Sequence, residues 1–231
     1  MRRPAAFIIG LVALWAAAGS PLADMDHHLL TAHMAQHLLL MTVAAPLVLL
    51  GAPAVTWPRG LNWMRALGRV GDRPVFCWLA ATATVIGWHV PALFELGMRS
   101  AGWHAFEQAS FFVAGVLFWR PVIRPSASLA TSSRWGVPLY LFLATLPCDA
   151  LSAFLTFCGR VVYPHYLSMH RLFDISPLAD QECAGALMWV WVTFVYLAPA
   201  AVITIQLLSP LHLREAAIHE QLNSGDEAAV V

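Results

Sequence analysis

Long apolar stretches separated by short polar connections make up most of this 231-residue chain. A helix needs about 20 apolar residues to cross the hydrocarbon core of a bilayer. Five stretches have that length, at residues 34–55, 75–97, 105–123, 136–158 and 184–208. The pattern therefore predicts an all-α protein, a polytopic transmembrane helix bundle with five full spans.

A sixth apolar stretch, residues 5–19, is shorter and directly follows Arg2 and Arg3. It is either a signal peptide, for which the small residues Ala18 and Ser20 suit a cleavage site, or a short first span. The expected organisation is a signal peptide or short first transmembrane helix over 1–23, a transmembrane bundle over 24–209 and a cytoplasmic tail over 210–231.

The positions of the arginines predict the orientation of the spans. All 13 basic residues are arginine, and ten of them fall on one side of the predicted bundle. Because cytoplasmic connections are enriched in Arg and Lys, that side is predicted to be cytoplasmic. The N-terminus, the connections 56–74 and 120–135, and the tail then face the cytoplasm, whereas 24–33, 98–104 and 159–183 face outward.

Composition excludes several classes of protein. The chain is 59% hydrophobic and 11% charged, whereas soluble domains are about 25% charged. A disordered chain, a nucleic-acid binder and almost any soluble enzyme are thereby excluded, and no nucleophile–base pair or hydrolase motif indicates a membrane enzyme. The net charge of zero is a cancellation across the membrane, with five excess arginines inside and five excess acids outside.

Histidines are concentrated on the predicted outer side. Surface filling does not explain this, because the outer connections are short. Eight of the ten histidines lie there or in the outer half of a span, namely His27, His28, His33, His37, His89, His104, His165 and His170.

Spacing predicts a cluster of metal ligands at this side. His33, His37 and Met41 are four residues apart and therefore share one face of a helix. His89 lies near the outer end of the second full span, and His104 and Glu107 share a face of the third. Polar groups at such depth are costly unless they pair or face a wet interior. The candidate metal ligands are His33, His37, Met41, His89, His104 and Glu107.

Imidazole and thioether donors with few carboxylates favour Cu(I) over hard cations, while imidazole alone also suits zinc or haem iron. Copper is therefore the expected ligand, and a haem held by two histidines from facing spans is the alternative.

Further residues are expected around the cluster or above it. The connection 159–183 is long and polar enough to form a lid or a docking surface, although helix capping alone explains Asp180. Cys158 and Cys183 are a disulfide, a Cu(I) site or two buried thiols. The surrounding candidates are Met34, Gln36, Trp88, Asp149, His165, Met169, His170, Asp180, Gln181 and Met188.

Several motifs together resemble the polytopic CtaG family, assembly factors for cytochrome c oxidase of the caa type. They are His33-Met34-Ala35-Gln36-His37-Leu38-Leu39-Leu40-Met41 with Ala45-Pro46, Trp88-His89-Val90-Pro91, His104-Ala105-Phe106-Glu107, and Asp180-Gln181 with Leu187-Met188-Trp189. The resemblance covers about residues 30–200. Gln108 departs from it, because the family pattern often has His at this position.

The resemblance implies a non-catalytic role in making an active haem-copper oxidase, through its copper centres. It implies a multi-pass protein of the bacterial cytoplasmic membrane whose partners are oxidase subunits. A copper chaperone is a further candidate partner. Two alternatives stay open, a haem-binding or haem-handling membrane protein and a metal-free scaffold for an oxidase subunit.

Overall fold

The computed structural model describes residues 3–52, 73–125, 135–171 and 173–209. The predicted cytoplasmic tail and most of the connections 56–74 and 120–135 lie outside the described residues. All regular structure in the described ranges is helical, which confirms the all-α prediction. The elements are α1 (Arg3–Ala18), α2 (Pro21–Met25), α3 (Leu30–Leu38), the π-helical η1 (Leu39–Ala44), α4 (Ala45–Gly51), α6 (Pro74–His89), α7 (Pro91–Met98), α8 (Ala101–Ile123), α10 (Gly136–Phe157), α11 (His165–Ser168) and α12 (Pro177–Leu208).

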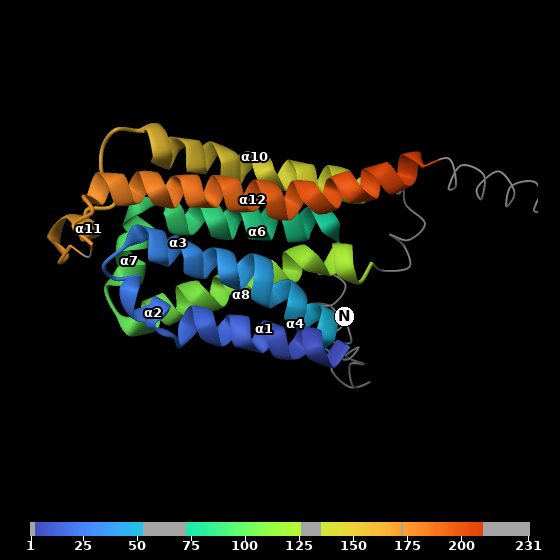
Figure 1. Cartoon of the computed structure of the whole chain (residues 1–231), viewed down its shortest axis with the longest axis horizontal. Coiled ribbons are helices and arrows are strands. Elements are labelled where there is room, and N and C mark those ends of the chain that lie inside the picture. The colour runs from blue at the N-terminus through green and yellow to red at the C-terminus, as the bar shows by residue number, and fades with distance from the viewer. Residues whose placement is uncertain (1–2, 53–72, 126–134, 172, 210–231) are drawn as a thin grey trace, which may run out of the picture.

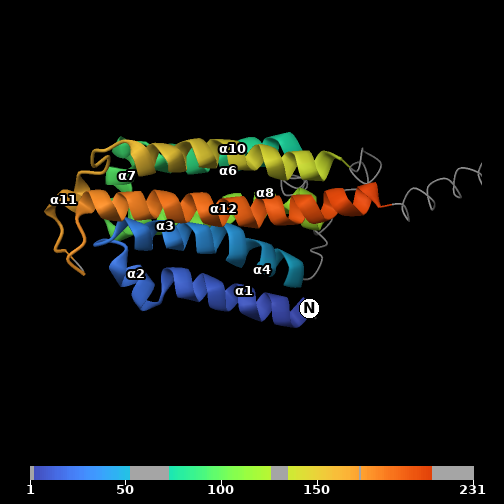
Figure 2. The ribbon, with the colours of Figure 1, turned by 45° about the horizontal axis from the view of Figure 1, so that its top comes forward.

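The long helices lie side by side along one axis (Figures 1 and 2). The short helices α2, α7 and α11 gather at the end of the bundle opposite the N-terminus. We call this the α7 end and the opposite one the N-terminal end. Helix α12 packs most extensively on α10 and also contacts α3, so it joins the two sides of the bundle.

Four of the described helical segments are long and apolar enough to span a membrane, and the bent pair α6–α7 makes a fifth. Helix α8 is 23 residues long but less apolar, because His104, Glu107 and Gln108 lie in its first two turns. Large apolar side chains such as Ile8, Phe142 and Phe194 are exposed on the outer faces of the bundle, as expected for lipid-facing helices. The polytopic architecture is thus confirmed.

The second predicted span is not one straight helix. Helices α6 and α7 meet at an angle of 77°. Pro91 has no amide hydrogen and forces Val90 into an extended conformation (φ −66°, ψ 124°), so α6 ends at His89. Tyr163 donates a hydrogen bond to the His89 carbonyl over 3.1 Å and so satisfies one group left free by the break.

The last helix begins at Pro177, seven residues before the predicted start at 184. The Ser176 hydroxyl accepts a hydrogen bond from the Ala179 amide, which is a standard N-cap, and Pro177 suits the first turn. The predicted start lies too far along the chain because Asp180 and Gln181 lower the local hydropathy, although both side chains are buried.

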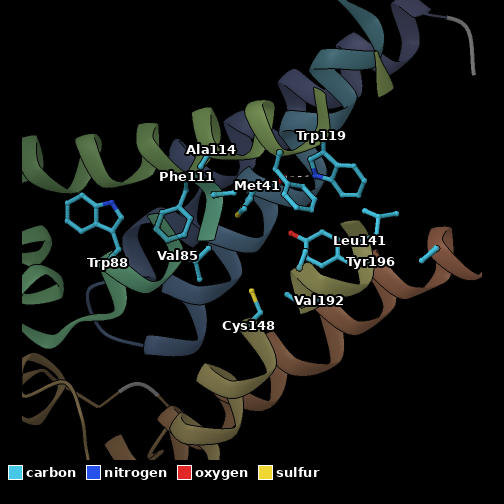
Figure 3. Close-up of a cluster of buried hydrophobic side chains, with 14 residues drawn as sticks. Met41, Val85, Trp88, Phe111, Ala114, Trp119, Leu141, Cys148, Val192 and Tyr196 are labelled. Carbon is cyan, nitrogen blue, oxygen red and sulfur yellow. Dashed lines mark hydrogen bonds between the residues drawn. The ribbon is translucent and has the colours of Figure 1, made fainter. Parts of the chain in front are cut away.

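The span that carries His37 contains a π-helical segment, Leu39–Ala44. In this register the amide of residue 46 would donate to the Met41 carbonyl, but Pro46 has none. The Trp119 indole donates to that carbonyl instead, over 3.1 Å (Figure 3). The extra residue in the turn alters the i, i+4 alignment of His37 with Met41 on which the sequence prediction relied.

Helix α1 packs closely on α4. A Cβ atom added to Gly10 would lie 2.7 Å from the Val48 amide nitrogen, so only glycine allows this approach. Gln36 donates from its amide to the Ala17 carbonyl over 3.0 Å. These contacts pack the first helix against the rest of the bundle.

Candidate metal centre

Helices α3 and α8 bring three ligand-type side chains together, which we call the buried triad: His33, His37 and Glu107. The Nε2 atoms of His33 and His37 lie 3.4 Å and 3.6 Å from Glu107 Oε1. Their side chains are 0%, 5% and 0% exposed. One ligand atom from each lies within 4.8 Å of the others, a spacing that allows all three to hold a single metal ion.

All six nitrogen and oxygen atoms of these side chains are buried without a hydrogen-bond partner among the described residues. Buried polar groups in proteins are almost always hydrogen-bonded, and an uncompensated buried carboxylate costs several kcal/mol. A bound cation is the simplest group that would satisfy the two imidazoles and the carboxylate at once.

Aromatic neighbours fix the orientation of the two rings. Phe111 stacks on His37 with the ring centroids 3.7 Å apart and the planes 17° from parallel. Phe94 lies 5.0 Å from His33, between centroids. These contacts on both sides hold the ligand atoms in place and keep the site apolar around them.

Closer to the α7 end lies a second group, the rim triad: Asp26, His27 and His104. Asp26 Oδ2 lies 3.0 Å from His104 Nε2, and Asp26 Oδ1 lies 3.7 Å from His27 Nε2. Asp26 is fully buried, whereas 43% of the His27 side chain is exposed. One ligand atom of each residue lies within 4.8 Å of the others.

Burial and neighbouring charges shift all three pKa values in the rim triad. Burial lowers the pKa of the His104 imidazole, but its hydrogen bond to Asp26 outweighs this and holds the pKa above its ordinary value. Burial raises the pKa of the Asp26 carboxyl, but its contact with His104 outweighs this and, with His33 and His27, holds the pKa below its ordinary value. Burial lowers the pKa of the His27 imidazole, against the opposing effect of Asp26. At neutral pH the carboxylate is thus ionised and the His27 imidazole is neutral, which are the forms that bind metals, whereas a metal ion at His104 would displace the proton that Asp26 stabilises there.

The two triads are adjacent. His104 stacks on His33 with centroids 5.7 Å apart and planes 21° from parallel. Gln108 Nε2 lies 3.2 Å from His104 Nε2 and 3.3 Å from Gln36 Oε1. A protonated His104 Nε2 donates to Asp26, whereas a bare one accepts from Gln108, so these contacts are alternatives for one nitrogen.

On the other side of His37 lies a small cavity of about 30 Å³, room for one or two water molecules. We call it the thioether cavity, because three methionines line it. Cys148 points toward it from α10, near Met41 and Phe111 (Figure 3). Its possible metal-binding side chains are His37, His89, Met34, Met41, Met188 and Cys148.

His89 belongs to this cavity rather than to either triad. Its Nδ1 lies 2.7 Å from the Val85 carbonyl, which can only accept, so Nδ1 carries the hydrogen. The Nε2 atom is then a bare acceptor, 3.2 Å from the Met34 sulfur. The structure therefore divides the single predicted cluster into the rim triad, the buried triad and the thioether cavity.

Asp180 and Gln181 make structural hydrogen bonds. The Asp180 carboxylate accepts from the amides of Leu30 (2.6 Å) and Thr31 (3.1 Å) at the start of α3. The Gln181 amide donates to the carbonyls of Leu155 and Arg160. Both residues hold the helices that carry the site and lie outside the triads.

The remaining predicted residues lie around these groups or away from them. Trp88 donates to the Ser110 hydroxyl over 2.7 Å. His165 lies beside the rim triad, with its Nε2 3.2 Å from the His27 carbonyl and its amide donating to Glu95. Asp149 is half-buried on α10, and neither it nor the part-exposed Met169 and the exposed His170 belongs to a triad or lines the thioether cavity.

Sequence reasoning missed Asp26, His27 and Cys148 as candidate ligands. The signal for the first two was the cluster Asp26-His27-His28 beside the predicted span of His33. Cys158 and Cys183 are not joined by a disulfide, and the expectation of two buried thiols is wrong, because Cys183 is exposed and Cys158 partly so.

A family model described as cytochrome c oxidase caa3 assembly factor (Caa3_CtaG) matches residues 1–209. The match includes every described helix and both triads, and it confirms the resemblance found in the sequence motifs. Neither a curated protein nor a solved structure matches the chain.

Proposed function

We propose that this chain, which belongs to the family of cytochrome c oxidase caa3 assembly factors, binds copper at the buried triad and passes it on during oxidase assembly. The family is described by assembly rather than by catalysis, so in this proposal copper is a cargo and not a catalytic cofactor. The observation that carries the proposal is the set of six buried, unpartnered ligand atoms on His33, His37 and Glu107.

The charge of the triad suits Cu(I). Two neutral imidazoles and one carboxylate carry a single negative charge, which a monovalent cation neutralises without leaving net charge in the bundle. Imidazoles bind copper well, and the thioethers beside His37 are ligands that select Cu(I). The thioether cavity therefore offers soft donors next to the buried triad.

The protein's own side chains would hold the metal and keep water away from it. Helix α3 carries His33 and His37 on a single rigid element, Phe94 and Phe111 pack against their rings, and Glu107 approaches from α8. Ligands held in this way release the metal by exchange with other ligands nearby. The neighbouring histidines and thioethers provide such ligands.

The size of the thioether cavity favours copper over haem. His37 and His89 both line it, with ring centroids 6.5 Å apart and ring planes at 69° to each other. A cavity of about 30 Å³ between them accommodates an ion or water but not a porphyrin. Haem binding would require the helices to separate.

Metal analysis of the purified full-length protein tests the proposal. Protein from copper-replete cells is compared with His37→Ala and with the control His170→Ala, an exposed histidine outside both triads. We expect copper in the wild type and in the control, and loss of the copper of the buried triad in His37→Ala. A Soret band without copper would support the haem alternative and contradict this proposal.

Oxidase maturation in cells separates copper binding from a metal-free scaffold. The double variant His33→Ala/His37→Ala keeps the outer faces of the helices, where oxidase subunits and lipid would bind, but lacks two ligands. We expect it to lose assembly of active oxidase, and unimpaired maturation would favour the scaffold. The proposed location is the bacterial cytoplasmic membrane, with the α7 end facing outward and a copper chaperone as a possible donor.

A further inference from the structure

We propose that the rim triad is a second metal site, which takes up the copper ion from the outside and passes it to the buried triad through His104. This inference rests on the proposed function, because it gives the buried triad a route of loading. It assigns a ligand role to Asp26 and His27, two residues of the connection between α2 and α3.

Ligand geometry supports a built site. Three residues from two separate parts of the chain converge, Asp26 and His27 before α3 and His104 from α8, with one ligand atom of each within 4.8 Å of the others. Two imidazoles and a carboxylate are the same donor set as in the buried triad. A cation here would be held by a negative charge that is already present.

Asp26 is more buried than an ordinary surface carboxylate. Its side chain is 0% exposed, and its two carboxylate oxygens lie 3.0 Å from His104 Nε2 and 3.7 Å from His27 Nε2. The surrounding chain fixes it by the backbone, since Tyr166 donates to the Asp26 carbonyl over 2.8 Å. The carboxylate is thus held toward the two imidazoles by packing, without competing donors.

The difference in exposure indicates which triad a metal ion reaches first. His27 is 43% exposed, while the ligands of the buried triad are at most 5% exposed. A metal ion from solvent therefore reaches His27 first. Helix α11 contributes His165, whose ring centroid lies 6.4 Å from that of His27, to the same exposed corner.

His104 connects the sites. Its ring lies 5.2 Å from that of His27 and 5.7 Å from that of His33, between centroids. An ion bound by Asp26, His27 and His104 can therefore exchange His27 for His33 while His104 stays bound. Transfer by stepwise ligand exchange needs no change in oxidation state and no unbound ion inside the bundle.

Titration of the purified full chain with Cu(I) alone, kept reduced under anaerobic conditions, tests this inference. Unbound metal is removed by desalting, and bound copper is counted per chain. The variants are Asp26→Asn, which keeps the shape but removes the charge, and His27→Ala, which removes a half-exposed ring of little structural weight. His37→Ala removes the buried triad, and His170→Ala is the control.

We expect the wild type and His170→Ala to bind two equivalents and Asp26→Asn, His27→Ala and His37→Ala to bind one each. Loading of the remaining buried triad should slow roughly tenfold or more in Asp26→Asn, the scale on which a lost supporting carboxylate acts in metal sites. Melting curves of the metal-free variants check that each is folded.

Unchanged stoichiometry and loading rate in both Asp26→Asn and His27→Ala would overturn the inference, and Asp26 would then only pair with His104. In that case the loss of copper in His37→Ala would leave the proposed function intact. Full stoichiometry in His37→Ala would contradict the proposed function instead, and a wild type that binds no copper would contradict both.

Discussion

Glu107 is the residue on which the buried triad depends most closely. It supplies the only charge of the triad, and Gly97 of α7 covers it at very short range. A Cβ atom added to Gly97 would lie 2.6 Å from Glu107 Oε2, so alanine would displace the carboxylate. The 77° bend after α6 thus has a consequence at the site, because it lays a glycine of α7 directly over a ligand.

Gly97→Ala should therefore weaken copper binding at the buried triad without changing any ligand. We expect a loss of roughly tenfold or more in affinity, as for other residues that position metal ligands. The measurement is competition with a copper chelator of known affinity. Gly87→Ala is the matched control, since an added Cβ meets nothing within 4 Å there.

The control should bind copper as the wild type does and gain up to about 1 kcal/mol in stability, because alanine favours a helix interior. Equal affinities of Gly97→Ala and Gly87→Ala would show that Glu107 does not bind the metal in this position.

At the scale of elements, α12 fixes the start of α3, which carries both histidines of the buried triad. Helix α3 has no capping side chain of its own, because residue 29 is leucine. Asp180 takes this role from a distance of about 150 positions in the sequence, accepting from the Leu30 and Thr31 amides and, over 2.6 Å, from the Thr31 hydroxyl. A carboxylate at a helix N-terminus also interacts favourably with the helix dipole.

Asp180→Ala should lower the stability of the protein by about 2 kcal/mol, because three hydrogen bonds to a charged acceptor are lost and the buried Leu30 amide loses its partner. Thermal unfolding in detergent measures this, with the exposed neighbour Glu182→Ala as control. If Asp180→Ala lowers the stability no more than Glu182→Ala does, the Asp180 cap does not stabilise the protein. Asp180→Asn should fall between the two, since the amide oxygen still accepts.

The arrangement of the whole molecule separates two ends of opposite character. The α7 end holds both triads, while the N-terminal end holds the starts of α1 and α6 and the end of α12. The distribution of arginines predicts that the N-terminal end is cytoplasmic. Copper would then arrive from outside the cell membrane, on the side where His27 of the rim triad is exposed.

Labelling with a membrane-impermeant maleimide in intact cells checks this orientation. A single cysteine is introduced as Arg99→Cys beside the end of α7 or as Ser209→Cys beyond α12, in a background with Cys158→Ser and Cys183→Ser. We expect the reagent to label position 99 and to label 209 only after the membrane is permeabilised. The reverse pattern would place both triads on the cytoplasmic side.

The sequence by itself determined the helical class, most of the spans and the types of residue at the site. An apolar run of bilayer length forms a helix because only a helix satisfies its backbone hydrogen bonds within the membrane. His33, His37, His104 and Glu107 stand out because polar groups in or beside such a run are costly to bury. Spacing within one helix also predicted correctly that His33 and His37 lie together, with their ring centroids 4.3 Å apart. These inferences depend only on local geometry and on the bilayer as solvent.

Tertiary structure alone decided how the ligands are grouped. The bend of 77° before Pro91 lets α7 turn back and cover Glu107. A π-helical turn shifted Met41, and the connection between α2 and α3 brought Asp26 and His27 onto His104. Each of these depends on how elements pack across long stretches of sequence, where a rotation of one residue moves a side chain to another face. The sequence therefore predicted one cluster, and packing divided it into a rim triad, a buried triad and a thioether cavity.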